Sequence, residues 1–243
     1  MNIALIGYGR MGKEVEVVAK EKGLNVVRTF TTANNKSGEA LNPESLKDVD
    51  VCIDFSSPSA AVANIEAVVK CGKNMVMGTT GWYDRMEYVK GLVTEKKIGF
   101  LYAANFSPGV NIFSRIVEDA SLLFDKHTEY DVAIHEIHHK EKADSPGGTA
   151  LSLASLLLNN LKRKTELLTE PSKGKIKPHQ LHVTSARVGH TTGQHTITFD
   201  SDNDTIELIH TARSRRGYAV GAVLAAQWLQ GKTGFHTMQD VIS

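Results

Sequence analysis

The segment 136–149 reads Glu-Ile-His-His-Lys-Glu-Lys-Ala-Asp-Ser-Pro-Gly-Gly-Thr and holds the densest group of side chains able to do chemistry. His138, His139 and Lys142 can all take part in proton transfer. The Gly-Gly-Thr turn at 147–149 precedes an apolar run, so its backbone N–H groups can bind a carboxylate at the start of a helix. The segment therefore predicts proton transfer beside a bound anion.

Two other interpretations of this segment compete. One is a solvated, charged loop, and the other is a metal site built from His138, His139 and their acidic neighbours. Adjacent residues of a strand point to opposite faces of the sheet, so these two histidines are poor joint ligands. We therefore expect no metal here.

A second basic group follows the last strand-like run and consists of Arg213, Arg215 and Arg216. Guanidinium groups bind carboxylates through paired hydrogen bonds. These arginines can therefore hold the second carboxylate of a dicarboxylate substrate. For any one of them, a solvated basic surface is an equally good interpretation.

The run 7–12, Gly-Tyr-Gly-Arg-Met-Gly, fits the pattern GxGxxG between a strand candidate and a helix candidate. In a dinucleotide site the first glycine permits a tight turn, the second lets the backbone approach the pyrophosphate, and the third lets helix and strand pack closely. Runs 78–81 and 103–106 follow two further strands, at the edge where open parallel sheets bind ligands. The alternative for all three is turn chemistry without a ligand.

Short apolar runs alternate with amphipathic stretches through the first 106 residues, which is typical of a parallel sheet covered on both faces. The alternation changes after Asn105. Farther along the chain, three strand candidates between residues 181 and 211 follow one another without a helix, separated by polar turns such as Ser201–Asp204, and indicate an open, mostly antiparallel meander. The charged segment Lys162–Pro178 predicts a surface loop. The strand candidates are Ile3–Ile6, Val26–Thr29, Val51–Phe55, Met75–Met77, Phe100–Ala103, Tyr130–Ile137, Leu181–Val188, His195–Asp200 and Thr205–Thr211, and the helix candidates are Met11–Lys22, Ala60–Lys70, Val110–Phe124, Ala150–Leu161 and Ala219–Leu229.

Charge and composition exclude several classes of partner. The formal net charge of +1 gives no reason to expect nucleic acid or a membrane surface. No apolar run reaches the roughly 20 residues of a membrane helix, and no signal peptide is recognisable at the first residues. Cys52 and Cys71 form neither a CxxC pair nor a metal cluster, so we expect reduced thiols in a cytoplasmic protein.

Five motifs occur in the order GYGRMG, DFSSP, MGTTGW, AANFSPGVN and EIHHKEKADSPGGTA, and the last is the most specific. Together they closely resemble the 4-hydroxy-tetrahydrodipicolinate reductase (dihydrodipicolinate reductase) family over nearly the whole chain. The resemblance implies NAD(P)H-dependent reduction of (2S,4S)-4-hydroxy-2,3,4,5-tetrahydrodipicolinate to tetrahydrodipicolinate, with loss of water, in the diaminopimelate route to lysine.

The resemblance also implies an α/β fold of two domains. Residues 1–106 and 217–243 would form a Rossmann-type nucleotide-binding domain. Residues 107–216 would form an α+β domain with an open mixed or antiparallel sheet, which binds the substrate and carries the oligomer contacts. The expected assembly is a homotetramer formed through these sheets.

By motif position, the resemblance implies that His138 and Lys142 handle protons. The expected substrate contacts are His139, Gly148 and Thr149, to which the basic group adds Arg215. The expected cofactor contacts are Gly7, Tyr8, Gly9, Arg10, Met11, Gly12, Thr32, Gly78, Thr79, Thr80, Ala103, Ala104, Asn105 and Phe106.

The coenzyme is predicted from the residues after the second strand. Longer family members place an acidic residue or an arginine there for the coenzyme ribose, whereas this chain has Thr31-Thr32-Ala33. No acid between Thr29 and Lys36 would repel a 2′-phosphate, and no arginine would clamp one. We therefore expect use of both NADPH and NADH, with a modest lean to NADPH.

Two alternative functions remain open at this point. One is an NAD(P)-dependent reductase of sugars or imines with a similar two-domain plan, which would need no site for 2,6-pyridinedicarboxylate. The other is a non-enzymatic dinucleotide-sensing module, and the dense histidine and lysine cluster argues against it because a sensor needs no proton donor.

Overall fold

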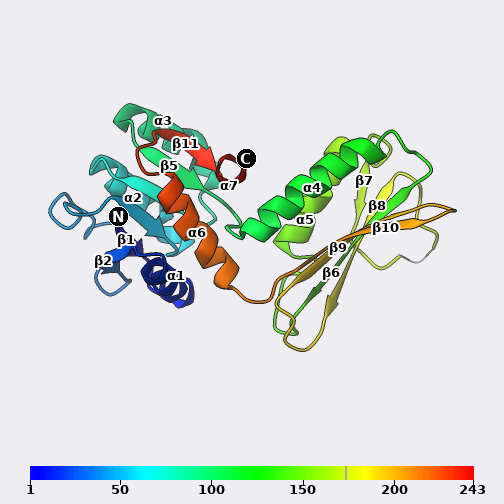
Figure 1. The fold of residues 1–243 in the computed structure, drawn as a ribbon, viewed down its shortest axis with the longest axis horizontal. Helices are drawn as coiled ribbons and strands as arrows, with labels where there is room; N and C mark the ends of the chain where they lie inside the picture. Colours follow the sequence, from blue (N-terminus) through cyan, green and yellow to red (C-terminus); the bar gives the residue numbers. More distant parts are fainter. Residues whose placement is uncertain (173) are drawn as a thin grey trace. The chain divides into compact units, whose positions relative to one another are not determined.

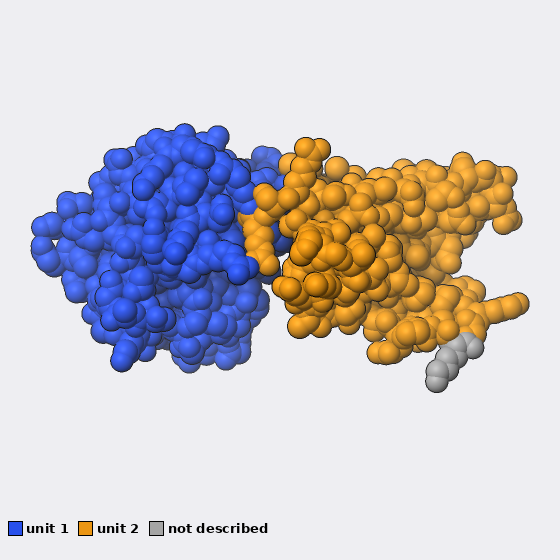
Figure 2. Space-filling model, turned by 90° about the horizontal axis from the view of Figure 1, so that it is seen from below, with its two compact units in different colours: residues 1–111, 216–243 blue, residues 112–215 orange. Residues whose placement is uncertain are grey.

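The structure is a computed structural model that describes residues 1–172 and 174–243. The chain forms two compact units, residues 1–111 with 216–243 and residues 112–215, which Figure 2 shows in blue and orange. The two divisions lie close to the predicted ones after residues 106 and 216. Within the described chain, no helix combines the length and the apolar character needed to cross a membrane.

A six-stranded parallel sheet in the order β11-β5-β4-β3-β1-β2 forms the centre of the first unit (Figure 1). Its elements are β1 (Asn2–Ile6), α1 (Arg10–Glu21), β2 (Asn25–Phe30), β3 (Val51–Asp54), α2 (Pro58–Lys70), β4 (Asn74–Met77), the short 3-10 helix η1 (Tyr83–Arg85), α3 (Met86–Lys96), β5 (Gly99–Tyr102), α6 (Arg216–Trp228), β11 (Gly234–Thr237) and α7 (Met238–Ile242).

Both faces of this sheet are buried, which explains why its strands are apolar without alternation. Ile3 and Leu5 of β1 belong to the core that contains residues of α1 and α6. Ala4 and Ile6 point to the opposite face and belong to the core that contains residues of α2 and α3. The parallel strands all end at the same edge of the sheet, and the glycine loop follows β1 there.

Four elements of this unit were not predicted from the sequence: η1, α3, β11 and α7. Strand β11 has four residues, all only partly buried, so it lacks the apolar run that marks the other strands. It pairs with β5 and extends the sheet by one strand beyond the five that were predicted.

The second unit contains a five-stranded mixed sheet in the order β10-β9-β6-β8-β7. Strand β6 runs antiparallel to β9 but parallel to β8, so the predicted meander of the last three strands was wrong: β6 lies between β8 and β9. The elements are α4 (Pro108–Phe124), which enters this unit at Ile112, β6 (Asp131–His138), α5 (Gly148–Asn160), β7 (Glu166–Leu168), β8 (Gln180–Arg187), β9 (Gln194–Asp200) and β10 (Thr205–Thr211).

The local predictions in this unit had mixed outcomes. The hairpin between β9 and β10 turns at Ser201–Asp204, where the Ser201 N–H donates to the Asp204 carbonyl at 3.0 Å. The segment Lys162–Pro178 is not entirely loop, because it contains β7. Lys173 of that segment lies outside the described residues.

Helices α4 and α5 cover one face of the mixed sheet (Figure 1). Ile134 of β6 and Ile197 of β9 point to this face and pack with Leu157 of α5. Residues of opposite parity, such as Thr196 and Thr198 of β9, point to the other face. No helix in the described part of the chain packs on that second face, and we call it the open face.

Candidate active site

The glycine loop between β1 and α1 needs glycine for two different reasons. Gly7 has φ +88°, and a Cβ there would lie 2.2 Å from the Phe55 carbonyl oxygen. A Cβ on Gly12 would lie 2.2 Å from the Gly7 carbonyl oxygen, so both glycines are required by the fold itself. Gly9 caps α1, and no atom lies within 4 Å of the place where its Cβ would be. Its open side leaves the free N-terminus of α1 accessible to a phosphate.

A hollow of about 330 Å³ lies next to this loop. It brings together four of the predicted cofactor residues, and its lining includes hydroxyl and amide side chains beside a helix N-terminus, which fits a dinucleotide. Ser56 and Ser57 also line the hollow and were not predicted, although both lie in the DFSSP motif and precede α2. The lining residues are Ile6, Gly7, Tyr8, Gly9, Phe30, Thr31, Thr32, Asn35, Lys36, Phe55, Ser56, Ser57, Ala60 and Asn64.

Asp54, at the end of β3, ties the neighbouring loops together. Its fully buried carboxylate accepts hydrogen bonds from the Thr79 hydroxyl (2.6 Å), the Asn64 amide (3.0 Å) and the Ser56 N–H (2.9 Å). Burial raises the pKa of this carboxyl group. The hydroxyl of Thr79, predicted as a cofactor contact, is thus used to hold the loop after β4.

The remaining predicted cofactor residues do not line the hollow. Arg10 and Met11 open α1, while Gly78 and Thr80 follow β4 and the run 103–106 follows β5, at the same sheet edge as Gly7. A Cβ on Gly78 would lie 2.2 Å from the Phe55 ring, so this glycine also serves packing.

In the second unit, the site is built around the carboxylate of Glu136 on β6, which is fully buried. Its Oε1 accepts hydrogen bonds from Arg187 Nη2 of β8 (2.7 Å), the Gly147 N–H (2.8 Å) and the Ser185 hydroxyl (3.1 Å). Burial by itself would raise the pKa of Glu136, but these three bonds outweigh it and hold the pKa below its usual value. The Gly147 N–H, predicted to be free for a substrate, is therefore occupied by the protein.

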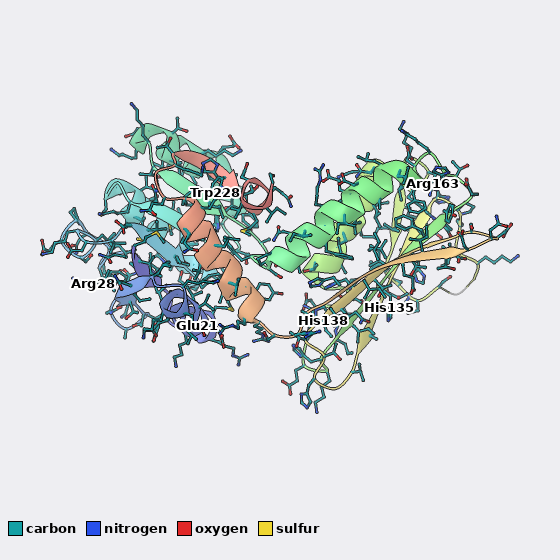
Figure 3. The ribbon with its side chains drawn as sticks, in the orientation of Figure 1. Glu21, Arg28, His135, His138, Arg163 and Trp228 are labelled. Carbon is teal, nitrogen blue, oxygen red and sulfur yellow. The ribbon has the colours of Figure 1, made fainter. Side chains whose placement is uncertain are left out.

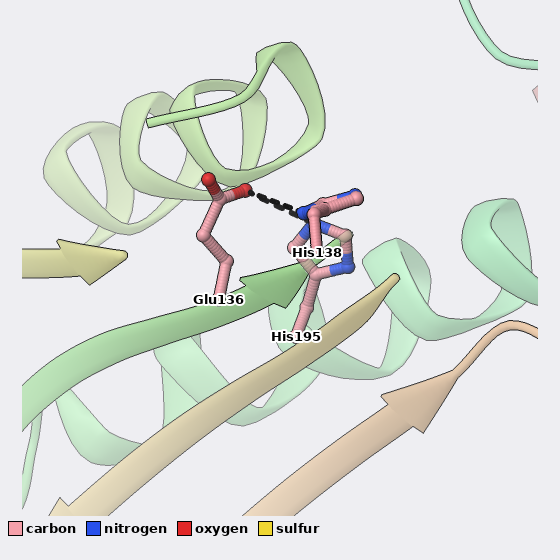
Figure 4. A group of neighbouring side chains, drawn as sticks. All are labelled: Glu136, His138 and His195. Atoms are coloured by element: carbon pink, nitrogen blue, oxygen red, sulfur yellow. Dashed lines mark ion pairs between the residues drawn. The ribbon is translucent and has the colours of Figure 1, made fainter. Parts of the chain in front are cut away.

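The other oxygen of Glu136 faces two histidines (Figure 4). Oε2 lies 3.5 Å from His138 Nδ1 and 3.7 Å from His195 Nε2, and none of these three atoms has a hydrogen-bond partner among the described residues. His138 shares a face of β6 with Glu136, and His195 lies opposite Glu136 on β9. Burial lowers the pKa of His138 and lowers that of His195 to about 4, so both rings are neutral at neutral pH.

Glu136, His138 and His195 each bring one potential donor atom within 4.8 Å of the others, a grouping that a metal ion would require. The metal site that the sequence suggested as an alternative combined His138 with His139 and did not include His195. Two positive charges oppose a divalent cation here. The first is the Arg187 guanidinium, which holds the same carboxylate. The second is the Lys142 ammonium, which lies near Glu136 Oε2 because a Cβ built on Gly147 would be 3.1 Å from Lys142 Nζ and 3.0 Å from that oxygen.

Lys142 lies in the segment between β6 and α5. Its ammonium donates to Asp144 Oδ1 at 2.6 Å. This bond is the main cause that holds the pKa of Asp144 below its usual value, and the Gly148 N–H at the start of α5 contributes to the same effect. A lysine and a helix N-terminus thus converge on one carboxylate, and Thr149 follows in the same helical turn.

A second hollow, of about 360 Å³, brings His139 together with Arg213 and Arg215. Two of the predicted substrate residues therefore share a basic recess in the second unit, and Arg213 joins them. The full lining is His139, Glu141, Gly189, His190, Thr192, Arg213, Ser214 and Arg215.

A parallel sheet with a glycine loop and a hollow at its carboxyl edge, joined to a unit that holds proton-transfer groups beside carboxylate-binding groups, defines an NAD(P)H-dependent oxidoreductase of two domains. Residues 1–106 match the family model "Dihydrodipicolinate reductase, N-terminus", and residues 109–242 match "Dihydrodipicolinate reductase, C-terminus". The chain belongs to the dihydrodipicolinate reductase family. The predicted family and the predicted fold class are confirmed.

Relatives agree over the full length. The 4-hydroxy-tetrahydrodipicolinate reductase of Christiangramia forsetii is 41% identical, with 100% of this chain and 98% of the relative covered. The enzyme of the same name from Archaeoglobus fulgidus is 37% identical, with 100% of both chains covered.

Solved structures share the fold. A dipicolinate-bound dihydrodipicolinate reductase from Paenisporosarcina is similar with a TM-score of 0.80 at 20% identity, and covers 99% of this chain and 98% of its own. An amine dehydrogenase from Mycobacterium smegmatis has a TM-score of 0.61 at 11% identity, with 96% and 93% covered. The two-domain plan alone therefore does not distinguish reductases of different substrates.

The geometry of Gly9 leads to a test of the nucleotide site. Gly9→Ala should leave the melting temperature unchanged, because the added methyl meets open space in the free protein. The same methyl should obstruct a pyrophosphate on α1 and weaken NADPH binding by at least about tenfold, or about 1.4 kcal/mol. Titration calorimetry measures this, with Gly91→Ala, also in open space, as the control. Unchanged NADPH affinity in Gly9→Ala would place the phosphates elsewhere.

Proposed function

We propose that this protein reduces (2S,4S)-4-hydroxy-2,3,4,5-tetrahydrodipicolinate to tetrahydrodipicolinate with NADPH or NADH, with loss of water, in the diaminopimelate route to lysine. Membership of the family and the names of the full-length relatives support this assignment. The observation that carries it is the convergence of the Lys142 ammonium and the Gly148 N–H on the carboxylate of Asp144. The chain thereby displays a carboxylate-binding site directly beside a proton donor.

In this proposal the residues of the second unit divide the work. When bound, the nicotinamide supplies the hydride that goes to C4 of the substrate ring. Lys142 and His138 handle the proton that is added at C3. The Gly148 N–H and Thr149 bind one carboxylate, while His139 and Arg215 bind the other within the basic recess.

The role of Lys142 is testable by substitution. Lys142→Ala should lower kcat by about 10²–10⁴-fold, the usual contribution of a general acid, and should raise KM much less. Lys140→Ala is the control, because Lys140 is an exposed residue of the same segment. Steady-state kinetics with the substrate and NADPH provide the measurement. A kcat near the wild-type value in Lys142→Ala would remove this residue from the chemical step.

The lining of the nucleotide hollow supports use of both coenzymes. Thr31, Thr32 and Lys36 line it together with Gly9, and none of its lining residues is acidic. Hydroxyl groups can serve either a ribose hydroxyl or a 2′-phosphate, and Lys36 adds a positive charge that favours the phosphate. The absence of a repelling carboxylate from this lining leaves NADPH acceptable.

Comparison of kcat/KM for the two coenzymes at one salt concentration tests this choice. The wild-type protein should use both, with a modest preference for NADPH. Lys36→Ala should reduce kcat/KM for NADPH about fivefold, which corresponds to about 1 kcal/mol for an exposed ion pair, and should leave NADH unchanged. Lys47→Ala is the control, because Lys47 pairs with Glu44 and does not line the hollow. A preference for NADH above about 100-fold would contradict the proposal.

We also propose that four copies assemble through the open faces of their mixed sheets. This face carries small, hydroxyl and imidazole side chains, including His135, labelled on β6 in Figure 3, whose Nδ1 lies 2.6 Å from the Thr184 hydroxyl. Ile209 of the edge strand β10 is more than half exposed on the same face, at 54%. A sheet with one uncovered face of this composition is suited to pack against a second sheet.

A charge placed at the middle of this face should prevent assembly. Wild-type protein should sediment as a tetramer, whereas Thr196→Arg should sediment as a smaller species, because its guanidinium would be buried without a partner. Ser155→Arg, on the exposed side of α5, should remain tetrameric. A wild-type monomer in analytical ultracentrifugation would refute the assembly.

We place the protein in the cytoplasm. Cys52 and Cys71 are both free thiols, and Cys52 is completely buried. Burial raises the pKa of the Cys52 thiol, so it stays protonated and unreactive. Two unpaired thiols are compatible with a reducing compartment.

A further inference from the structure

We propose that His195 is a positioning residue for the reduction, and that together with Glu136 it fixes the orientation and the tautomer of the His138 ring. The inference rests on the proposed role of His138 in proton handling. No part of the sequence pattern indicated His195, which lies on a different strand from His138 and meets it only through the pairing of β6 with β9.

The His138 ring is bounded on several sides. The His195 ring meets it edge to face, with 5.4 Å between the ring centroids and an interplanar angle of 74°. Glu136 Oε2 faces its Nδ1. Gly193 lies next to its Nε2, because a Cβ at that glycine would be 2.8 Å from this nitrogen. The ring is therefore held by contacts that leave few alternative rotations.

The hydrogen bonds of Glu136 determine the tautomer of His138. Glu136 Oε1 already accepts from three donors, so Oε2 remains as the free acceptor of an ionised carboxylate, which cannot donate. The nitrogens that face it must therefore carry hydrogens, at Nδ1 of His138 and at Nε2 of His195. At 3.5 and 3.7 Å both contacts exceed hydrogen-bond length, and a small rotation of either ring closes them. In this tautomer Nε2 of His138 carries no hydrogen, so its lone pair can accept a proton or a hydrogen bond.

His195 also limits how strongly Glu136 can stabilise a protonated His138. A hydrogen bond from the His195 N–H to Glu136 Oε2 partly neutralises the negative charge that would otherwise stabilise the imidazolium form of His138. Removal of that donor should raise the pKa of His138 and move the acidic limb of the rate profile to higher pH. The titratable and charged groups around the two rings are Glu136 of β6, His139 and Lys142 of the following segment, Arg187 of β8 and His210 of β10.

Two substitutions of His195 separate the effect of its N–H donor from the effect of its size. His195→Phe keeps a ring of similar size and removes the N–H group. His195→Gln keeps an N–H donor near the position of Nε2. His127→Phe, at an exposed histidine outside the cluster, controls for the loss of a histidine elsewhere.

The measurements are kcat and KM across the mildly acidic to neutral range, and the ¹⁵N shifts of the imidazole nitrogens, which distinguish the two tautomers. We expect the Nδ1–H tautomer of His138 in the wild type. His195→Phe should lower kcat by about 10- to 100-fold, the range for groups that orient a functional histidine, with an upward shift of the acidic limb and little change in coenzyme KM. His195→Gln should restore most of kcat and the wild-type profile.

Several results would overturn the inference. Wild-type kcat and pH profile in His195→Phe would remove His195 from the reaction. Equal loss in both variants with an unchanged His138 tautomer would make its role merely structural. Stoichiometric zinc binding that activates the wild type and is lost in both variants would make the cluster a metal site. A wild-type protein that does not reduce the substrate would instead refute the proposed function, and the tautomer measurement needs no substrate.

Discussion

A fully buried ionised carboxylate is the constraint around which the second unit is organised. Removing a charge from water costs several kcal/mol unless other groups of the protein replace the lost hydration. Glu136 obtains this replacement from Arg187 and the Ser185 hydroxyl of β8 and from the Gly147 N–H at the start of α5, while two imidazoles lie beside its second oxygen. These partners come from different elements, so satisfying one carboxylate sets the position of the first turn of α5 relative to the sheet. The segment that carries Lys142 is anchored at both ends by the same group.

The first unit contains a second buried carboxylate with the opposite electrostatic outcome. Asp54 is held by hydroxyl, amide and backbone donors and not by a cation, and its pKa is raised, whereas that of Glu136 is lowered by its ties to Arg187 and its other donors. Neutral donors give a rigid floor to a nucleotide hollow without adding charge. The cationic surroundings of Glu136 accumulate positive potential, which suits a doubly charged anion. The two sites thus use the same type of side chain for different purposes.

A structural feature could be predicted from the sequence where neighbouring residues encode it, and could not where it depends on contacts between distant segments. The glycine loop, the strand β1 and the helix α1 are encoded within neighbouring residues, so the pattern predicted them. The parallel pairing of β6 with β8 and the meeting of Glu136 with His195 depend on strand order and register, which no local pattern contains. Glu136 opens the most specific motif of the chain, yet its role as an acceptor became visible only when Gly147 and Arg187 were seen to point at it. Strand β11 was missed because it is short and half-buried.

The order of the chain has a consequence for synthesis on the ribosome. The first unit is interrupted by residues 112–215 and is completed by residues 216–243. Helix α6 from this last part packs Ala222 and Ala226 against the same core as Ile3 and Leu5 of β1. A nascent chain that has emerged only to residue 215 can therefore close the second unit, while the face of β1 and β3 that α6 covers is still bare and the edge of β5 still lacks β11. The nucleotide-binding half, although it begins first, is finished last, and its exposed apolar face in that interval is the part most in need of protection from aggregation.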